Sequence, residues 1–351
     1  IGGSTMSVRW GVIGAGGIAD RRTIPEGIVP ATNAELVAVC DQPDVVEEVA
    51  RKYDVRGHAQ ARDLIACDDV DAIYIASPTQ LHRDHAARAA EAGKHVLCEK
   101  PLGRTVAECD EIVDACKSAG VTLGVNFMMR FHACHARLAE MVVAGDVGTR
   151  VFGRAELTCW YPAIPGAFRQ DPELGGGGAF ADMGNHCIDV LEMFLGRTVS
   201  VQGATANLVQ DYAAEDTSAC LLTFESGALG VIDSLFNVPD DAARNMLEIY
   251  GSRGSVVSSG TIGQDSSGVL RTILEKEDRA YDAAQIRDEG ATEQLIEPEP
   301  VNIYQAHIEA FSQAVVDGTD PPVTGEDGVW NHRVVEAVYE SARNGRRVEL
   351  G

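Results

Sequence analysis

Hydrophobic residues in the first third of the chain fall into short runs separated by amphipathic stretches. The apolar runs lie at residues 8–13, 35–40, 71–76, 95–98 and 121–125, and their lengths predict buried strands. Helical periodicity is found at residues 44–53, 81–92 and 106–119, and a further helix is expected to begin near Gly17. Strands that alternate with helices at this spacing predict an α/β fold, a doubly wound parallel sheet with helices on both faces.

The pattern changes after about residue 126. Helices are predicted at residues 131–144 and 180–195, whereas β-rich runs lie at 150–160, 199–208, 219–224, 228–236 and 246–250. Residues 265–300 are polar, acidic and poorly periodic, and two helices at 303–316 and 329–344 flank a Gly- and Pro-containing breaker at 318–322. This part predicts an α+β domain with a large, open, mostly antiparallel sheet.

The first predicted strand ends in a glycine-rich turn, Gly14-Ala-Gly16-Gly17-Ile18-Ala19. The first glycine allows a tight turn, the second lets the backbone approach a pyrophosphate, and the small last residue permits close packing of the helix on the strand. The free N–H groups at the start of that helix favour phosphate. The context of strand, turn and helix predicts a dinucleotide site with Gly14, Gly16, Gly17 and Ile18 at the phosphates, although a turn that only packs is the alternative.

An acidic residue, Asp41, ends the second predicted strand, where the adenosine ribose of a dinucleotide would lie. A carboxylate at this place accepts hydrogen bonds from the ribose hydroxyls and repels a 2′-phosphate. Gln42 and Pro43 follow, and no arginine adjoins the acid. The sequence therefore favours NAD as cofactor, with NADP possible, and the N-cap of the next helix is the structural alternative for Asp41.

The tripeptide Glu99-Lys100-Pro101 follows a predicted parallel strand. It is expected at the carboxyl edge of the sheet, where doubly wound folds bind ligands. Burial and a nearby cofactor lower the pKa of a lysine toward working pH. The proline would fix the direction of the lysine, and a cis peptide bond is one way to do so. Lys100 is therefore a candidate proton-handling group.

Asp182 and His186 are spaced four residues apart after a run of four glycines. On a helix this spacing places both side chains on one face, as a catalytic pair or as a plain helix-surface pair. Oxidising an alcohol requires loss of the hydroxyl proton, and histidine is the natural base for that proton at neutral pH. A neighbouring carboxylate would orient the imidazole or raise its basicity.

Charge and cysteine usage exclude several classes of partner and compartment. The net charge of −24 argues against nucleic acid and anionic membrane as partners, and no apolar run reaches the ~20 residues that span a bilayer. The five lysines and 24 arginines fit either a high-salt cytoplasm or a GC-rich genome. The nine scattered cysteines fit a reducing compartment, so a cytoplasmic location is expected.

No metal is expected. The sequence His132-Ala-Cys134-His135 has no further ligand pair at matching spacing, so it predicts a solvated helix face. The Asp182 and His186 pair likewise lacks well-placed cysteine ligands or a third histidine.

These segments together resemble the Gfo/Idh/MocA oxidoreductases, the family of glucose–fructose oxidoreductase and inositol dehydrogenase. The resemblance rests on residues 14–19, 77–82, 91–101 and 175–189 and extends over nearly the whole chain from Val8. It implies a Rossmann domain at 8–126, a C-terminal substrate-binding and oligomerisation domain at 127–351, and NAD(P)-dependent hydride transfer to or from a sugar, polyol or inositol. Residues 1–7 are expected to comprise a tag remnant, Ile1–Thr5, and the native start at Met6.

The resemblance also implies roles for individual residues. Lys100 would bridge the nicotinamide ribose and the substrate hydroxyl, Asp182 would bind substrate and tune the base, and His186 would be the general base or acid. The other implied contacts are Ser77, Pro78, His82 and Glu99 for the cofactor, and Asn126, Arg130 and Arg169 for the substrate.

Three functions are compatible with these features. The leading one is an NAD-dependent dehydrogenase acting on CH–OH groups of a sugar or polyol. The alternatives are an NADP-dependent keto-sugar reductase of the same fold and a catalytically silent nucleotide-binding regulator, although a silent relative would be expected to lose Lys100 or His186. Apolar residues alternate through 219–224 and 229–236 on what should be both sheet faces, which predicts a homodimer or homotetramer joined through that sheet.

Overall fold

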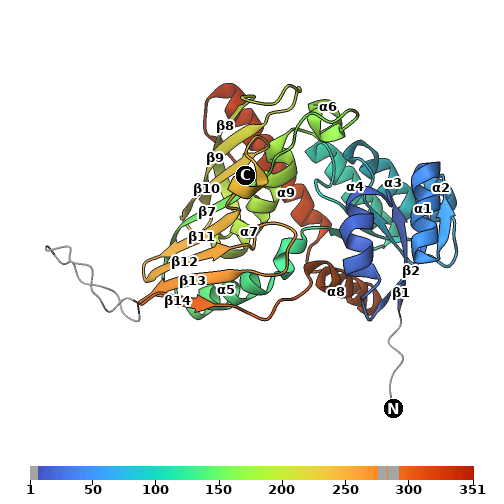
Figure 1. Cartoon of the computed structure of the whole chain (residues 1–351), viewed down its shortest axis with the longest axis horizontal. Coiled ribbons are helices and arrows are strands. Elements are labelled where there is room, and N and C mark those ends of the chain that lie inside the picture. Colours follow the sequence, from blue (N-terminus) through green and yellow to red (C-terminus); the bar gives the residue numbers. More distant parts are fainter. Residues whose placement is uncertain (1–6, 276–282, 284–291) are drawn as a thin grey trace, which may run out of the picture. The chain divides into compact units, whose positions relative to one another are not determined.

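The computed structural model describes residues 7–275, 283 and 292–351. The expected tag remnant and much of the acidic segment 265–300 therefore lie outside the described residues. Contacts divide the chain into two compact units, coloured along the sequence in Figure 1. The first unit comprises Ile1–Met128, Gly166–Gly177 and Asn302–Arg333, and the second comprises Met129–Pro165, Gly178–Val301 and Val334–Gly351.

This division differs from the single boundary near residue 126 that the sequence predicts. Two later segments return to the first unit. Residues 166–177 are held there by Arg104, whose Nη1 donates to the carbonyl of Glu173 at 3.3 Å. The helix α8 (Ile303–Asp317) buries Ile308 and Phe311 in the core of the first unit. The continuous domain expected over 127–351 is therefore interrupted twice.

The first unit is built on a six-stranded sheet in the order β3-β2-β1-β4-β5-β6, with every neighbouring pair parallel. The strands are β1 (Val8–Ile13), β2 (Ala34–Cys40), β3 (Arg56–His58), β4 (Ala72–Ile75), β5 (His95–Cys98) and β6 (Leu123–Val125). The helical elements of this unit, most of them labelled in Figure 1, include η1 (Ala19–Ile28), α1 (Pro43–Tyr53), α2 (Ala61–Ile65), η2 (Thr79–Leu81), α3 (His82–Glu91), α4 (Val106–Ala119) and, in the returning segment, η4 (Phe168–Gln170) and α6 (Pro172–Gly175). The predicted doubly wound parallel sheet is confirmed.

Trp10 of β1 connects this sheet to α8. Its side chain is fully buried, and its indole N–H donates to Ser312 Oγ at 3.2 Å. The centroid of its ring lies 5.4 Å from the centroid of the Phe311 ring. A buried indole needs a partner for its N–H, and α8 supplies both that partner and the apolar surface.

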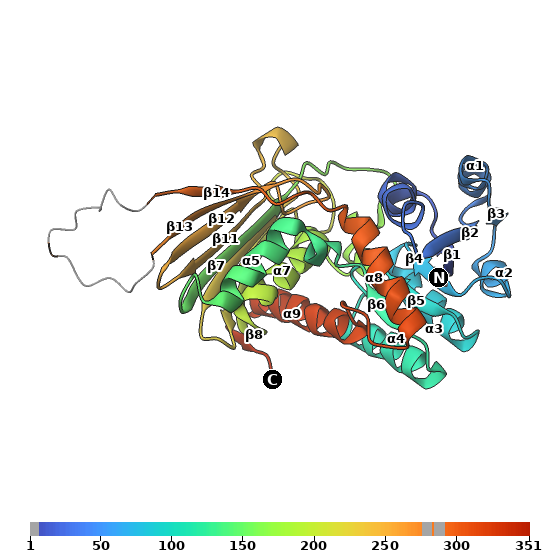
Figure 2. The same cartoon turned by 90° about the horizontal axis from the view of Figure 1, so that it is seen from below.

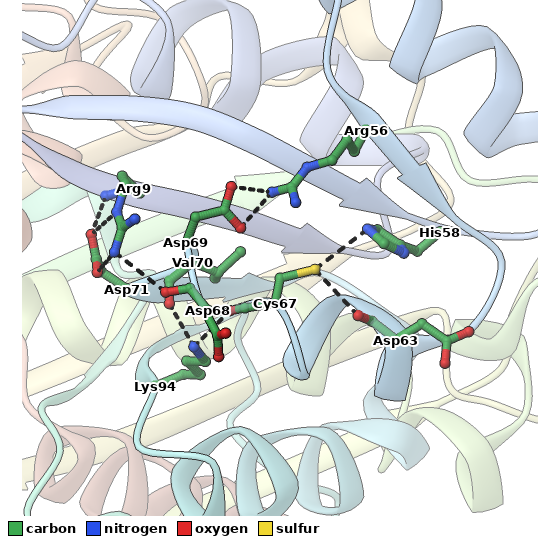
Figure 3. A network of polar contacts seen from close by, with 10 residues as sticks. All are labelled: Arg9, Arg56, His58, Asp63, Cys67, Asp68, Asp69, Val70, Asp71 and Lys94. Carbon is green, nitrogen blue, oxygen red and sulfur yellow. Dashed lines mark hydrogen bonds and ion pairs between the residues drawn. The ribbon is translucent and has the colours of Figure 1, made fainter.

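A polar network holds the amino edge of the sheet (Figure 3). Arg9 on β1 makes a forked ion pair with Asp71, with Nε and Nη2 at 2.8 Å and 2.6 Å from the two carboxylate oxygens. The hydrogen bonds from Arg9 lower the pKa of Asp71. Lys94 Nζ donates to the carbonyls of Cys67 and Val70, each at 2.8 Å. These contacts fix the turn that precedes β4, and this turn lies at the amino ends of the strands, opposite their carboxyl ends.

The second unit contains a nine-stranded sheet in the order β14-β13-β12-β11-β7-β10-β9-β8-β15. Among the described strands, only β7 and β10 pair in parallel, so the predicted mostly antiparallel sheet is confirmed. The strands are β7 (Arg150–Thr158), β8 (Thr198–Ala206), β9 (Thr217–Phe224), β10 (Leu229–Leu235), β11 (Met246–Gly251), β12 (Gly254–Ser259), β13 (Val269–Leu274), β14 (Gln294–Ile296) and β15 (Val348–Glu349).

Helices α5 (Ala133–Ala144) and α7 (Asn185–Leu195) lie on one face of this sheet (Figure 2). Gly153 of β7 gives α7 room, because a Cβ there would lie 2.7 Å from Leu195 of that helix. The last helix, α9 (Gly325–Asn344), packs Val338 against Gly203 of β8. On the opposite face Leu221, Leu229 and Ile273 are 40–44% exposed. No helix among the described residues has both the length and the apolarity to cross a membrane.

Candidate active site

A cleft of about 630 Å³ opens at the glycine turn of the first unit. Gly14 has a φ of +84°, and a Cβ on it would lie 2.4 Å from the backbone nitrogen of Ser77. Gly17 also has positive φ, but a Cβ there would meet nothing within 4 Å. The turn is thus closed toward β4 and open toward the cleft, as a backbone cradle for phosphate requires.

Most of the predicted cofactor residues gather at this cleft. Its walls include Gly14, Gly16, Gly17, Asp41, Ser77 and Pro78. Ile18, His82, Glu99 and Lys100 are not among the lining residues.

Asp41 braces the cradle from the end of β2. Its Oδ2 accepts from the backbone N–H of Gly16 at 2.9 Å, and its Oδ1 accepts from that of Gln42 at 2.6 Å. A Cβ on Gly16 would lie 3.0 Å from Val45 and 3.4 Å from Asp41 Oδ2. One carboxylate therefore fixes the glycine turn and lines the cleft.

The cleft is also lined by residues that were not predicted from the sequence. Gln60 comes from the turn after β3, Arg62 from α2, His85 and Arg88 from α3, and Phe168 from the returning segment. His85 Nδ1 lies 3.0 Å from Ser77 Oγ, and burial lowers the pKa of His85. Arg169 covers the Phe168 ring, with its guanidinium carbon 4.5 Å from the centroid. The predicted helix that contains His82 could have indicated His85, because the two residues are one helical turn apart.

Glu99 anchors the turn that carries Lys100. The Glu99 side chain is 9% exposed, and its Oε1 accepts from the Tyr74 hydroxyl and, at 2.6 Å, from Asn126 Nδ2. Its Oε2 accepts from the backbone N–H of Lys100 at 3.1 Å. The Lys100–Pro101 bond is cis. The Tyr74 hydroxyl, the Asn126 amide and the Lys100 N–H all donate to the carboxylate, so Glu99 fixes the backbone of Lys100 to the buried side chains of Tyr74 and Asn126.

Asn126 and His82 occupy buried positions next to this turn. Asn126 is 3% exposed, and its Oδ1 accepts from His307 of α8 at 2.9 Å. His82 is 1% exposed and lies 2.8 Å from the carbonyl of Ser77 and 3.0 Å from that of Pro101. Burial lowers the pKa of His82, whereas the hydrogen-bonding carbonyls of Ser77 and Pro101 oppose that fall, and the ring lies between the two loops. Sequence reasoning missed His307, which lies 181 residues from Asn126.

In the second unit, Asp182 and His186 lie on one continuous helical segment. A π-helical turn, η5 (Phe180–Gly184), contains Asp182 and leads directly into α7, which contains His186. His186 is 5% exposed, whereas Asp182 is half-buried. A Cβ on Gly184 would lie 2.6 Å from the Phe180 ring, so glycine is needed at this turn. π-Turns within α-helices are frequent at functional sites.

Arg130, predicted to contact substrate, makes a forked ion pair with Asp189 of α7 in the second unit. Asp189 is only 3% exposed on its side chain. The pair thus compensates a buried carboxylate on the helix of His186.

The sequence His132-Ala-Cys134-His135 is not solvated, and that expectation is wrong. His132, Cys134 and His135 are at most 1% exposed. Burial, with the nearby His132, lowers the pKa of His135 to about 3, so this imidazole is neutral in the core. Within the described residues, no group of three or more His, Cys, Asp or Glu side chains is arranged to hold a metal ion.

The cleft fits a dinucleotide. A glycine cradle with an open side, a helix beginning behind it and a carboxylate at the end of β2 are the donor and acceptor set that such a cofactor needs. Gly14, Gly16 and Gly17 would hold the phosphates, and Asp41 would face the adenosine ribose.

Comparison with known proteins agrees with this architecture. Residues 8–127 match the model described as oxidoreductase family, NAD-binding Rossmann fold, and residues 135–257 match the GFO/IDH/MocA C-terminal domain. The chain is 30% identical over 343 residues to D-xylose 1-dehydrogenase (NADP(+)) 2 of Haloferax volcanii, covering 97% of this chain and 99% of the relative. It is 29% identical over 348 residues to 1,5-anhydro-D-fructose reductase of Ensifer adhaerens, covering 97% and 98%.

Among solved structures, aldose-aldose oxidoreductase from Caulobacter crescentus, complexed with glycerol, matches with a TM-score of 0.86 and 27% identity. The match covers 98% of this chain and 100% of that chain. The chain therefore belongs to the Gfo/Idh/MocA family of oxidoreductases and carries both its NAD-binding Rossmann domain and its C-terminal domain.

Proposed function

We propose that this protein is an NAD(P)-dependent dehydrogenase that acts on a CH–OH group of a sugar, polyol or inositol. The observation that carries the proposal is the glycine cradle, closed toward Ser77 and open toward a 630 Å³ cleft. The names of the two relatives, a xylose dehydrogenase and an anhydrofructose reductase, support a sugar as the substrate. Retention of Lys100 and His186 disfavours the silent regulator.

The proposed chemistry assigns one task to each residue. A nicotinamide cofactor, when bound, would supply the hydride acceptor for the oxidative direction and the hydride donor for the reductive one. Lys100 binds the oxygen of the reacting hydroxyl, and His186 takes the proton from that oxygen as the carbonyl forms. Asp182 binds substrate and orients the imidazole. In the reductive direction His186 returns the proton to the same oxygen.

Further contacts complete the proposed site. Glu99 and His82 are placed by their hydrogen bonds to support Lys100 and Ser77 from behind. The proposed cofactor contacts are Gly14, Gly16, Gly17, Ile18, Asp41, Ser77, Pro78, His82, Glu99 and Lys100, and the proposed substrate contacts are Lys100, Asn126, Arg130, Arg169, Asp182 and His186.

NAD is the proposed cofactor, because Asp41 lines the cleft with a carboxylate that would repel a 2′-phosphate. The second candidate is an NADP-dependent keto-sugar reductase. It is supported by Arg62 and Arg88 in the cleft walls and by the NADP(+) in the name of the Haloferax volcanii relative. The two candidates differ in cofactor and direction but share the same residues.

A cytoplasmic homo-oligomer is the proposed physiological form. The nine cysteines carry no disulfide among the described residues, which suits a reducing compartment. The exposed leucines and Ile273 on the outer sheet face favour covering by a second copy of the chain.

One assay separates these possibilities. The purified protein is mixed with a panel of sugars, inositols and sugar acids and with NAD or NADP, and reduced cofactor is followed by its absorbance. Keto-sugars with NADH or NADPH test the reverse direction. Turnover of no substrate in either direction, by a protein that binds the cofactor, would favour the silent regulator instead.

A further inference from the structure

The helical segment that carries Asp182 and His186 begins without a local cap. A helix leaves its first N–H groups unsatisfied, and Ser, Thr, Asp or Asn at the N-cap normally bonds one of them. Here the N-cap residue is Ala179, and no side chain at that position caps the turn. The first amide bonded within the segment is that of Asp182, which donates to the carbonyl of Gly178 at 3.0 Å.

Glu215, from the loop before β9, binds three of the amides that have no partner within the helix. Its Oε2 accepts from the N–H of Gly178 at 2.8 Å, and its Oε1 accepts from that of Phe180 at 2.9 Å. Its backbone carbonyl accepts from the N–H of Ala179 at 3.0 Å. The approach is so close that a Cβ on Gly178 would lie 2.2 Å from that carbonyl oxygen. This contact explains why the last of the four glycines is needed.

Tyr339 of α9 binds the remaining amide. Its hydroxyl oxygen accepts from the N–H of Ala181 at 3.1 Å and from that of Gly178 at 3.2 Å. Its own proton is donated to Glu215 Oε1 at 2.7 Å. The Tyr339 ring also meets Phe180 edge-on, with 6.2 Å between centroids. All four amides at 178–181 are thereby satisfied by two residues that are distant in sequence.

The Glu215 carboxylate is buried, and burial of a charged group is unfavourable unless hydrogen bonds compensate for it. It is 9% exposed, and burial raises its pKa, while hydrogen bonds from Phe180, Tyr339 and Gly178 oppose that rise. The positive end of the helix also favours a negative group here. An amide side chain could not replace it, because both oxygens accept from N–H groups and an amide offers only one acceptor.

We propose that Glu215 and Tyr339 are positioning residues that fix the direction of the segment presenting Asp182 and His186. The inference rests on the proposed function, in which those two side chains handle substrate and proton. Small displacements of a catalytic group by a remote substitution can cost up to about 10²-fold in rate, so a cap built from four hydrogen-bonded amides is a means of controlling rate as well as stability.

The test uses Glu215→Gln and Tyr339→Phe in the full chain, with Glu192→Gln as the matched control. Glu192 lies near the other end of α7, where its Oε1 accepts from the N–H of Thr198 at 2.9 Å. Hydrogen–deuterium exchange of peptides covering residues 175–186 reports the cap directly, without substrate. Titration of ¹³C-labelled histidine reports the His186 ring, and steady-state kinetics with a cofactor-binding measurement report function.

We expect at least about tenfold faster exchange at residues 178–181 in both cap variants and an altered titration of His186. The value of kcat/KM should fall tenfold to hundredfold, while the cofactor Kd stays within about twofold and Glu192→Gln matches the wild type.

Unchanged exchange in Tyr339→Phe and in any folded Glu215→Gln protein would overturn the proposal. So would faster exchange with unaltered His186 titration and unaltered kcat/KM. A wild type without turnover would defeat the proposed function, and the exchange and titration measurements would still decide the cap.

Discussion

The guanidinium of Arg130 is forked onto the carboxylate of Asp189, with Nη2 at 2.6 Å and Nε at 2.9 Å from Oδ1. The Asp189 side chain is 3% exposed, and that of Arg130 is 24% exposed. This ion pair links the start of the second unit to the helix of His186. The carboxylate of this pair is buried, so loss of the arginine is costly.

We expect Arg130→Met to lower the free energy of unfolding by about 3–5 kcal/mol, because it removes the guanidinium that compensates the buried Asp189 carboxylate. Urea denaturation measures the change. Arg137→Met is the control, since Arg137 and Glu140 form an exposed pair on α5 whose loss should cost less than about 1 kcal/mol. Equal losses in the two variants would contradict the structural role assigned to Arg130.

Lys100→Met is expected to lower kcat/KM by at least about 10²-fold while the cofactor Kd changes much less. The reason is that Glu99 holds the backbone of residue 100 through its N–H, which any side chain leaves intact. Steady-state kinetics and calorimetric titration of the cofactor measure the two quantities. A near-normal rate in the folded variant would remove Lys100 from the mechanism.

Asp41→Ser should weaken NAD binding and raise the NADP to NAD preference. The substitution removes the carboxylate proposed to face the adenosine ribose, and with it the acceptors for the N–H groups of Gly16 and Gln42. The kcat/KM for each cofactor is the measurement. A wild type that already prefers NADP would show that the proposed role of Asp41 is wrong.

Asp216 should make the free energy of unfolding depend on pH in the acid range. Burial alone would raise its pKa, but N–H donors at Gln210, Leu208 and Val209 lower it from 3.8 to about 2. A depressed folded-state pKa contributes stability above pH 3.8, and this contribution is lost as pH falls through about 2. The wild type should exceed Asp216→Asn by an additional ~2 kcal/mol at pH 7 relative to pH 2.

Urea unfolding at the two pH values measures this difference. Asp241→Asn, at an exposed position, is the control and should show almost none of it. A gap between wild type and Asp216→Asn that stays constant from pH 7 to pH 2 would contradict the assignment.

The outer face of the large sheet should mediate self-association. Leu221 pairs with Val231 across β9 and β10, and Leu221 is 43% exposed. Light scattering should give at least twice 37.4 kDa for the wild type in near-physiological and in molar salt. Leu221→Glu should shift the mass toward the monomer, whereas Val143→Glu, at an 88% exposed position of α5, should not. A wild-type monomer under both conditions would refute the prediction.

Local pattern determined much of the fold. The strands at 8–13 and 95–98 and the helix at 106–119 have the predicted limits, because apolar runs, turn residues and a capping threonine act within a few residues of one another. Thr105, for example, caps α4 by accepting from the N–H of Glu108. The glycine turn was equally readable, since steric exclusion at Gly14 admits only glycine.

Tertiary structure decided what depends on distant partners. The short strand β3 and strands β12 to β14 have weak periodicity of their own and exist through pairing with their neighbours. The division of the chain also depended on α8, whose return is fixed by the contact of Trp10 with Phe311 and Ser312. The burial of His132 and His135 likewise follows from packing.

The candidate site divides in the same way. The sequence by itself determined the residue types proposed to meet cofactor and substrate, because glycine, lysine, aspartate and histidine stand there in short motifs with a known chemical use. Only the tertiary structure determined what holds them. Asn126 and His307 are 181 residues apart, and Gly178 and Tyr339 are 161 apart. Hydrogen bonds between buried groups at such separations arise from the folded chain, and no local pattern encodes them.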